Sequence, residues 1–215
     1  MRKLTLFISL VFAALAYAQM TTIPAIIQQD YSGEVTVIYN PNEGNGGMVD
    51  ATECYAHTGV TYDGTSWRNA SSWRGGEDKY KMTQNADGNW ELKITPSIHE
   101  YYGVDNAKTI DQLCFVFNDG PTGTKEGKSA ENGDFFVNLV ESGLAVIITN
   151  TIPEISQQND QLTLNCIATE SASLALSVNG KQVATAEGTE LQYTCTLAEV
   201  GDYTFTFTAT KGDVV

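Results

Sequence analysis

The stretch Lys79-Tyr-Lys-Met-Thr-Gln-Asn-Ala-Asp-Gly-Asn-Trp-Glu-Leu-Lys-Ile94 decides the fold class of this chain. Its Asp87-Gly88 pair is typical of the tight turn that joins two antiparallel strands. After this turn, Trp90 and Leu92 alternate with charged side chains, which is the period of a half-buried strand. The stretch therefore predicts a β-hairpin with strands at 79–82 and 90–94, and it assigns Trp90 to the core.

The same alternation recurs through the first two thirds of the chain. Strands are expected at 33–39, 52–60, 113–117 and 135–139. A short helix is expected at 97–102, because Ser97 and Glu100 form a capping box and Gly103 suits the helix end. These elements predict an all-β domain at 33–140, a β-sandwich of the carbohydrate-binding-module type.

The composition changes near residue 140, and no Trp or His occurs after residue 145. Turns are expected at Asn179-Gly180, Gly188 and Gly201. The strands that they separate are expected at 145–149, 161–169, 173–178, 191–197 and 202–210. This pattern predicts an immunoglobulin-like β-sandwich at 141–215. Such a domain normally needs one more strand, so either that strand is absent or the chain is the N-terminal piece of a longer protein, and we favour the second interpretation.

The first 18 residues have the three parts of a secretory signal peptide. Arg2 and Lys3 precede an apolar run at 4–15, and Ala16-Tyr-Ala18 supplies the small residues of a cleavage site. The run is too short for a membrane span. We expect export to the periplasm, the cell surface or the medium, a linker at 19–32, and no membrane span in the mature protein.

The charge balance excludes one class of partner. Without Arg2 and Lys3, ten basic residues face 26 acidic ones, which gives a net charge of −16. Proteins that bind a phosphate backbone need clustered Lys and Arg. We therefore expect no nucleic-acid partner, and the balance is compatible with a neutral polysaccharide.

The four cysteines divide into one pair in each half of the chain. Export permits disulfides, but four cysteines allow three connectivities, and the sequence does not choose among them. Free buried thiols fit equally well, notably for the cysteine at position 114 in an apolar strand. None has the spacing of a metal ligand, so neither a metal nor another cofactor is indicated. The candidates for disulfides are Cys54, Cys114, Cys166 and Cys195.

Two tryptophans stand in a polar, loop-like segment at 64–76. Such a setting favours exposed rings, which can stack on the apolar face of a pyranose while neighbouring polar groups bind its hydroxyls. The alternative is that these rings fill the sandwich core. The predicted carbohydrate-binding residues are Trp67 and Trp73, the flanking Tyr101 and Tyr102, and the polar Asn69, Glu77, Asp78 and Lys79.

No residue pattern indicates catalysis within this chain. His57 is interpreted as a hydrogen-bonded structural residue beside a turn, and His99 as a solvent-facing helix residue. No Gly-x-Ser-x-Gly elbow occurs, and carboxylates are too numerous to single out a pair for glycoside hydrolysis. Residues 85–91 are faintly similar to a calcium loop, but the hairpin turn is the stronger interpretation. We expect no catalytic activity.

A series of motifs occurs in an order that is more specific than any one of them. In that order they resemble the N-terminal accessory, carbohydrate-binding-like module of secreted Bacteroidetes α-amylases. The motifs are Tyr55-Ala-His-Thr-Gly-Val60, Trp67, Trp73, Asp78-Lys-Tyr-Lys-Met-Thr83, Asn89-Trp-Glu-Leu-Lys-Ile94, Pro96-Ser-Ile-His-Glu-Tyr-Tyr-Gly-Val104, Leu113-Cys-Phe-Val-Phe-Asn118, Gly127-Lys128 and Asp134-Phe-Phe-Val137. The resemblance covers about residues 34–140, roughly half the chain.

The region after that module resembles the immunoglobulin-like domain that usually follows it in these enzymes. The resemblance implies a non-catalytic region of a glycoside hydrolase family 13 polypeptide, which binds or positions starch or a related α-glucan for a downstream catalytic domain. One departure is Val116-Phe-Asn-Asp119, where the module usually has Val-Phe-Arg-Asn. The alternative function is a structural spacer or interaction module without a ligand.

Overall fold

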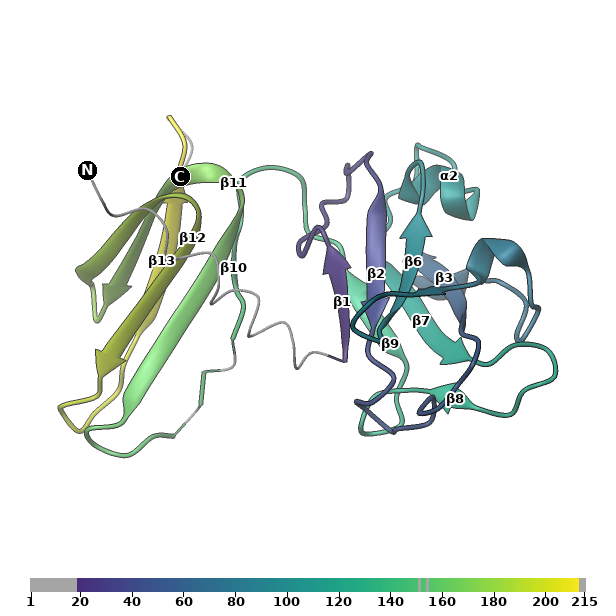
Figure 1. Ribbon diagram of the computed structural model, residues 1–215. Helices are drawn as coiled ribbons and strands as arrows, with labels where there is room; N and C mark the ends of the chain where they lie inside the picture. Colours follow the sequence, from purple (N-terminus) through teal and green to yellow (C-terminus); the bar gives the residue numbers. More distant parts are fainter. Residues whose placement is uncertain (1–18, 151, 154, 213–215) are drawn as a thin grey trace. The chain divides into compact units, whose positions relative to one another are not determined.

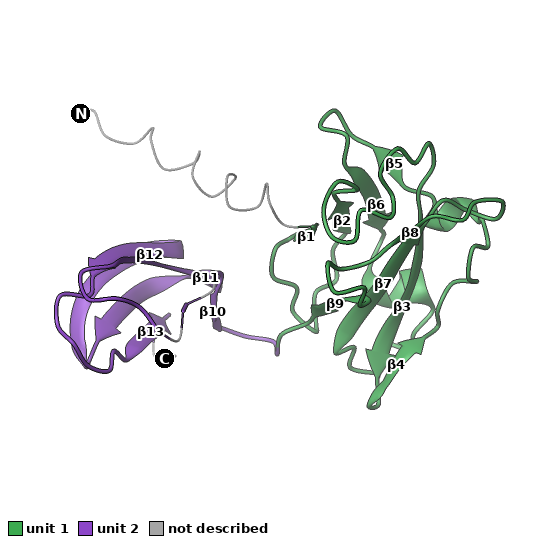
Figure 2. Ribbon diagram, turned by 90° about the horizontal axis from the view of Figure 1, so that it is seen from below, with its two compact units in different colours: residues 1–140 green, residues 141–215 purple. Residues whose placement is uncertain are grey.

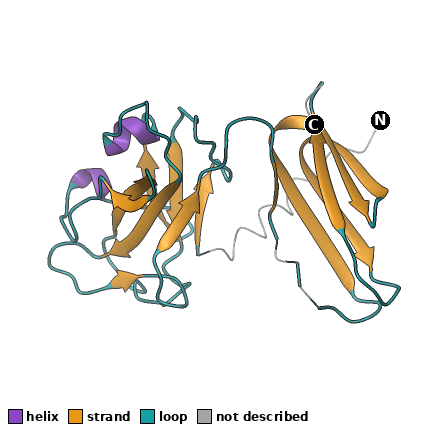
Figure 3. Cartoon of the chain, turned by 180° about the vertical axis from the view of Figure 1, so that it is seen from behind, coloured by secondary structure: helices purple, strands orange, loops and turns teal. Residues whose placement is uncertain are grey.

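The computed structural model describes residues 19–150, 152–153 and 155–212. Strands make up most of its regular structure (Figure 3), which confirms the predicted all-β class. Two compact units divide the chain, one up to Val140 (unit 1) and one from Glu141 onward (unit 2), as Figure 2 shows. The predicted signal peptide at 1–18 lies outside the described residues.

Unit 1 consists of two antiparallel sheets (Figure 1). Sheet I contains, in spatial order, β1 (Met20–Ile23), β2 (Val35–Tyr39), β6 (Trp90–Ile94) and β5 (Thr83–Gln84). Sheet II contains, in spatial order, β4 (Thr65–Arg68), β3 (Tyr55–Tyr62), β7 (Gln112–Asn118) and β8 (Glu126–Gly127), and β9 (Phe135–Asn138) also pairs with β7.

The core of unit 1 contains inward side chains from both sheets. Val35, Val37 and Tyr39 alternate with outward residues on β2 and are fully buried. The ring of Tyr39 stacks on Phe117 of sheet II with a centroid distance of 4.0 Å. Burial of alternate apolar residues from two facing sheets is the arrangement of a β-sandwich.

The predicted hairpin is present between β5 and β6, and Trp90 is buried in the core as expected. The Asn85 amide donates to the Asn89 carbonyl across the turn, and Gly88 has a φ of 83°. The strand expected at 79–82 is replaced in its first half by η1 (Asp78–Tyr80), which is a 3₁₀ turn. This turn lies against α2 (Ile98–Tyr102), where the Tyr101 hydroxyl donates to the Lys79 carbonyl at 2.7 Å.

The short helix predicted at 97–102 is α2. Its N-cap Ser97 accepts a hydrogen bond from the Glu100 amide, and Gly103 ends it in the left-handed conformation with a φ of 65°. The capping residues therefore act as their types predict.

The segment at 19–32, predicted to be a linker, is part of the sandwich. Its strand β1 pairs with β2 along four residues, and Ile27 is buried. The Val140 amide donates to the Ile27 carbonyl at 2.9 Å, which ties the segment to the end of unit 1. The prediction was wrong because the strand is short and its apolar residues find partners only in the folded state.

Unit 2 has four described strands in one antiparallel sheet: β10 (Val146–Ile148), β11 (Gln161–Val178), β12 (Lys181–Thr196) and β13 (Phe205–Thr210). The hairpin at Asn179-Gly180 is confirmed. One long strand, β11, replaces the two strands predicted at 161–169 and 173–178. The expected turn at Gly188 is instead a position within β12, opposite Ala172, at a shift in register.

A single hydrophobic cluster in unit 2 contains residues from both sides of that register shift, including Leu164 and Leu174. Gly188 has a φ of 123°, which a residue with a side chain rarely adopts, so this glycine suits the irregular part of the ladder. The immunoglobulin-like assignment of this unit stays a prediction.

All four cysteines are free thiols. On β3 and β7, Cys114 faces Gly59, five positions from Cys54, which corresponds to about 16 Å along the strands. In unit 2, Cys166 faces Leu191, four positions from Cys195. A disulfide needs Cα atoms within about 7 Å, so neither pair within a half can form without rearrangement.

In the part of the chain that the structure describes, neither helix has the length and apolar character needed to cross a bilayer.

Candidate functional site

The outer face of sheet II carries the aromatic residues that the sequence singled out. On β3, Ala56 and Val60 point into the core, so His57 and Gly59 point outward. Antiparallel partners share a face, and His57 is paired with Val116 of β7. We define the outer face by His57, Gly59 and Thr61 of β3 and by Gln112, Cys114 and Val116 of β7.

His57, Trp67 and Trp73 form an aromatic cluster on this face. The rings of His57 and Trp67 are stacked, with centroids 4.8 Å apart and planes 14° apart. The Trp73 ring meets His57 edge-on at 5.0 Å. Trp73 remains 47% exposed and Trp67 is half-buried, so both indoles keep accessible surface while His57 supports them.

The backbone that carries these indoles is held in unusual conformations. Trp67, Asn69 and Arg74 have φ angles of 61°, 52° and 54°, in the left-handed region that bulky residues rarely adopt. Each such residue costs on the order of 1–3 kcal/mol, so surrounding contacts must fix it. Gly59 allows the loop to approach β3 closely, because a Cβ at this position would lie only 3.1 Å from the Cβ of Ala70.

Asn69 supplies one of these fixing contacts. Its side-chain amide donates to the Tyr102 carbonyl at 2.9 Å, and its oxygen accepts from the Tyr62 hydroxyl at 3.1 Å. These contacts hold the loop in place, and because Asn69 is exposed its role in binding sugar hydroxyls stays a prediction.

Arg74 anchors the other end of the Trp73 loop. Its guanidinium forms a 2.8 Å ion pair with Asp119, and it also donates to the Lys125 carbonyl at 2.8 Å. The two side chains are only 19% and 18% exposed. Desolvation raises the pKa of Asp119, but hydrogen bonds from Arg74 and from the Lys125 and Thr124 amides outweigh it, so the net pKa is below the ordinary 3.8.

Asp119→Ala is expected to destabilise unit 1 by about 2 kcal/mol, because a charged acceptor of several hydrogen bonds is lost. The lowered pKa means that the unfolded state takes up the proton first, so this stabilisation is present above pH 3.8 and is lost below it. Urea denaturation at pH 7 and pH 3 checks both statements. An equal difference between variant and wild type at the two pH values would contradict the second.

His57 is held in its neutral form by the cluster. Burial lowers its pKa from the ordinary 6.5, although the Asp134 carboxylate and hydrogen bonds with Ser71 and Ser72 oppose this effect. Its Nδ1 lies 3.2 Å from the Ser71 hydroxyl. At neutral pH the stacked ring is therefore uncharged. The interpretation of His57 as a hydrogen-bonded residue agrees with this contact, but it lies within β3 and not beside a turn.

An NMR titration of His57 is expected to give a midpoint below 6.5. The unfolded chain binds this proton more readily than the folded one, so His57 lowers the free energy of unfolding, and with it the stability, as the pH falls through 6.5. His57→Asn should therefore lose less stability than the wild type between pH 7.5 and pH 5.5. A midpoint above 6.5 would refute the argument.

Tyr101 and Tyr102 do not flank the site, which corrects the prediction. Both are buried in the core of unit 1. The Tyr102 hydroxyl lies 2.6 Å from Thr58 Oγ1, which points inward from β3. In a helix of five residues the two rings can pack against one another and against the sheet, and their centroids are 5.0 Å apart.

The polar residues at 77–79 lie on the exposed 3₁₀ turn η1 and its N-cap. Lys79 is bound to the Tyr101 carbonyl, and its ammonium lies 4.5 Å from the centre of the Tyr101 ring, so it fastens η1 to α2. Glu77 and Asp78 are exposed and stay candidates for binding sugar hydroxyls.

Sequence reasoning missed three features of this face. His57 is its centre, and alternation along β3 from the inward Ala56 could have placed it outward. Phe136 is 47% exposed next to the buried Phe135, and neighbouring strand residues always face opposite sides. The Arg74–Asp119 pair joins segments 45 residues apart in sequence, and no local pattern indicates it.

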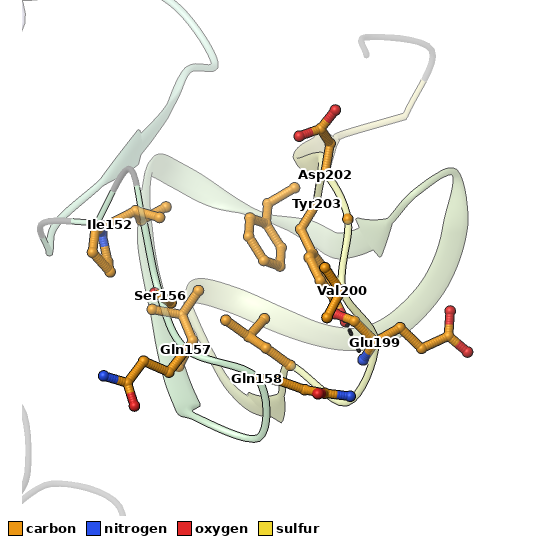
Figure 4. A pocket seen from close by; sticks show the side chains of 13 residues that line it. Ile152, Ser156, Gln157, Gln158, Glu199, Val200, Asp202 and Tyr203 are labelled. Carbon is orange, nitrogen blue, oxygen red and sulfur yellow. Dashed lines mark hydrogen bonds between the residues drawn. The ribbon is translucent and has the colours of Figure 1, made fainter.

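A cavity of about 440 Å³ lies in unit 2 (Figure 4). Its lining includes Gln157, Glu199, Tyr203 and Phe205, and none of the predicted binding residues. The Tyr203 hydroxyl is already bonded to the backbone of Glu199 at 3.1 Å. The described lining contains neither histidine nor cysteine, and we assign no chemistry to this cavity.

Comparison with known proteins identifies no family for this chain. No family model matches it, and no curated protein matches it significantly. Among the described residues, no group of three or more His, Cys, Asp or Glu side chains is arranged to hold a metal ion. The outer face of sheet II is therefore the basis for the function proposed below.

Proposed function

We propose that unit 1 binds a neutral polysaccharide, starch or a related α-glucan, on the outer face of sheet II. The observation that carries this proposal is the half-exposed Trp73 beside Trp67 and the neutral His57. Indole rings bind the apolar face of a pyranose at low entropic cost, because a ring side chain has only two rotatable bonds to fix.

The contacts that hold the loop of the aromatic cluster in place favour a binding role over a purely structural one. Strained conformations at Trp67, Asn69 and Arg74 are maintained by hydrogen bonds and an ion pair, although the loop does not fill the core. Proteins keep such strain where side chains must be presented in a defined orientation. Preorganised rings lose less entropy on binding, which raises affinity.

The wider context is part of the same proposal. The chain is an exported, non-catalytic region of an α-amylase-type polypeptide, and unit 1 holds α-glucan near a catalytic domain supplied by that polypeptide. The order of motifs at 55–137 supports this context, as do the signal-like residues 1–18 and the net charge of −16 after their removal. A spacer without a ligand is the competing function.

Affinity electrophoresis tests the proposal. The purified chain is expected to be retarded in native gels that contain amylopectin or glycogen, and to migrate normally in gels that contain hydroxyethylcellulose. Trp67→Ala should reduce the retardation. Absence of retardation by every α-glucan would refute the proposal and leave the spacer function.

A further inference from the structure

Phe136 is a second exposed aromatic on the outer face of sheet II. It is 47% exposed, whereas its neighbour Phe135 is buried against Tyr39 and Phe117 in the core. Phe136 is paired with Cys114 of β7, which is itself on the outer face. The half-exposed phenyl ring of Phe136 is therefore available to a ligand on this face.

The outer face between Phe136 and the aromatic cluster is covered at its centre. Val116 and Cys114 lie between them in the sheet, and although both point outward, Val116 is only 3% exposed and Cys114 is fully buried. The 68–70 segment lies over part of this face, since a Cβ on Gly59, the partner of Cys114, would lie 3.0 Å from the Arg68 carbonyl oxygen. His57 and Phe136 are two strands and two residues apart, about 12 Å between Cα atoms, which exceeds one hexose ring.

Charged groups lie beside Val116 on this face. Lys128 Nζ is 2.8 Å from Glu126 and 3.7 Å from Asp134, and all three side chains are about one third exposed. Asp134 precedes Phe135, the partner of Phe115, so the ladder brings it beside Val116. Its carboxylate is close enough to raise the pKa of His57 through its charge. An ion-paired carboxylate is well suited to accept hydrogen bonds from sugar hydroxyls.

We propose that Phe136 forms a second sugar-binding subsite, with Asp134 and Lys128 between it and the Trp67–His57–Trp73 cluster. This inference rests on the proposed function. One linear, uncharged glucan chain crosses β3, β7 and β9, stacks on Trp73 at one end and on Phe136 at the other, and hydrogen-bonds with Asp134 in between. Because two carboxylates, those of Glu126 and Asp134, surround the one Lys128 ammonium, the local charge repels an anionic glycan.

Titration calorimetry with maltose and maltoheptaose tests the inference on the full chain. The wild type is expected to bind maltoheptaose more tightly than maltose. Phe136→Ala should lose about fivefold in affinity for maltoheptaose, the scale of one ring contact, and should keep the affinity for maltose. Ile23→Ala is the matched control, since Ile23 is an exposed apolar residue of sheet I.

Asp134→Asn gives a second measurement. It should weaken maltoheptaose binding and also lower the NMR titration midpoint of His57, because the opposing carboxylate is removed. A Phe136→Ala protein that binds maltoheptaose as tightly as the wild type would overturn the second subsite alone. A wild type that binds neither sugar would overturn the proposed function.

Discussion

Trp73→Ala is expected to abolish the retardation of the chain by amylopectin. The substitution removes the most exposed indole of the aromatic cluster, and stacking residues at the centre of an interface commonly cost 2 kcal/mol or more on truncation. At 1.4 kcal/mol for each factor of ten, the affinity should fall by about thirtyfold. Affinity electrophoresis over a range of amylopectin concentrations measures this change.

The stability of the same variant separates binding from packing. Because the ring is 47% exposed, Trp73→Ala should change the free energy of unfolding by no more than about 1 kcal/mol. The buried Trp90 is the matched control, since Trp90→Ala should cost about 3–5 kcal/mol. Full retardation of Trp73→Ala in amylopectin would contradict the stacking role.

Phe117→Ala is expected to destabilise unit 1 by about 3–5 kcal/mol, as much as Trp90→Ala. Phe117 is fully buried, stacks on Tyr39 at 4.0 Å and lies 5.6 Å from Phe135. Its removal leaves a cavity between the two sheets and breaks the aromatic contacts that join them. All three tryptophans lie in unit 1, so the tryptophan fluorescence change in urea reports its unfolding.

Phe136→Ala serves as the control for this experiment. It removes the same ring from an exposed position of the same sheet, so its unfolding free energy should stay within about 1 kcal/mol of the wild type. Similar losses for the two phenylalanines would show that the assignment of inner and outer faces is wrong.

Local patterns predicted the parts of the fold that depend on neighbours in sequence. The Asp87-Gly88 turn, the burial of Trp90 and the capping of α2 by Ser97 and Gly103 follow from residue types a few positions apart. The linker prediction at 19–32 and the separate strands in β11 failed for the opposite reason. Those segments are defined by pairing in the folded state, the first with Val140 and the second with β12 and β13.

The candidate site shows the same division. Polar surroundings predicted accessible indoles at Trp67 and Trp73, but the tyrosines of α2 could not be placed, because a five-residue helix can turn either side toward a sheet. Strand alternation was sufficient to place Phe136 outward, yet only the register between β7 and β9 shows that it shares a face with His57.

The sequence by itself determined the all-β class, the hairpin at 83–94, the helix caps and the aromatic character of the region, because backbone preference and hydrophobic period act over a few residues. Only the tertiary structure decided which rings are buried, which polar groups are already bonded and which strands are neighbours. Burial and cross-strand pairing depend on residues far apart in the chain, such as Arg74 with Asp119 and Tyr39 with Phe117.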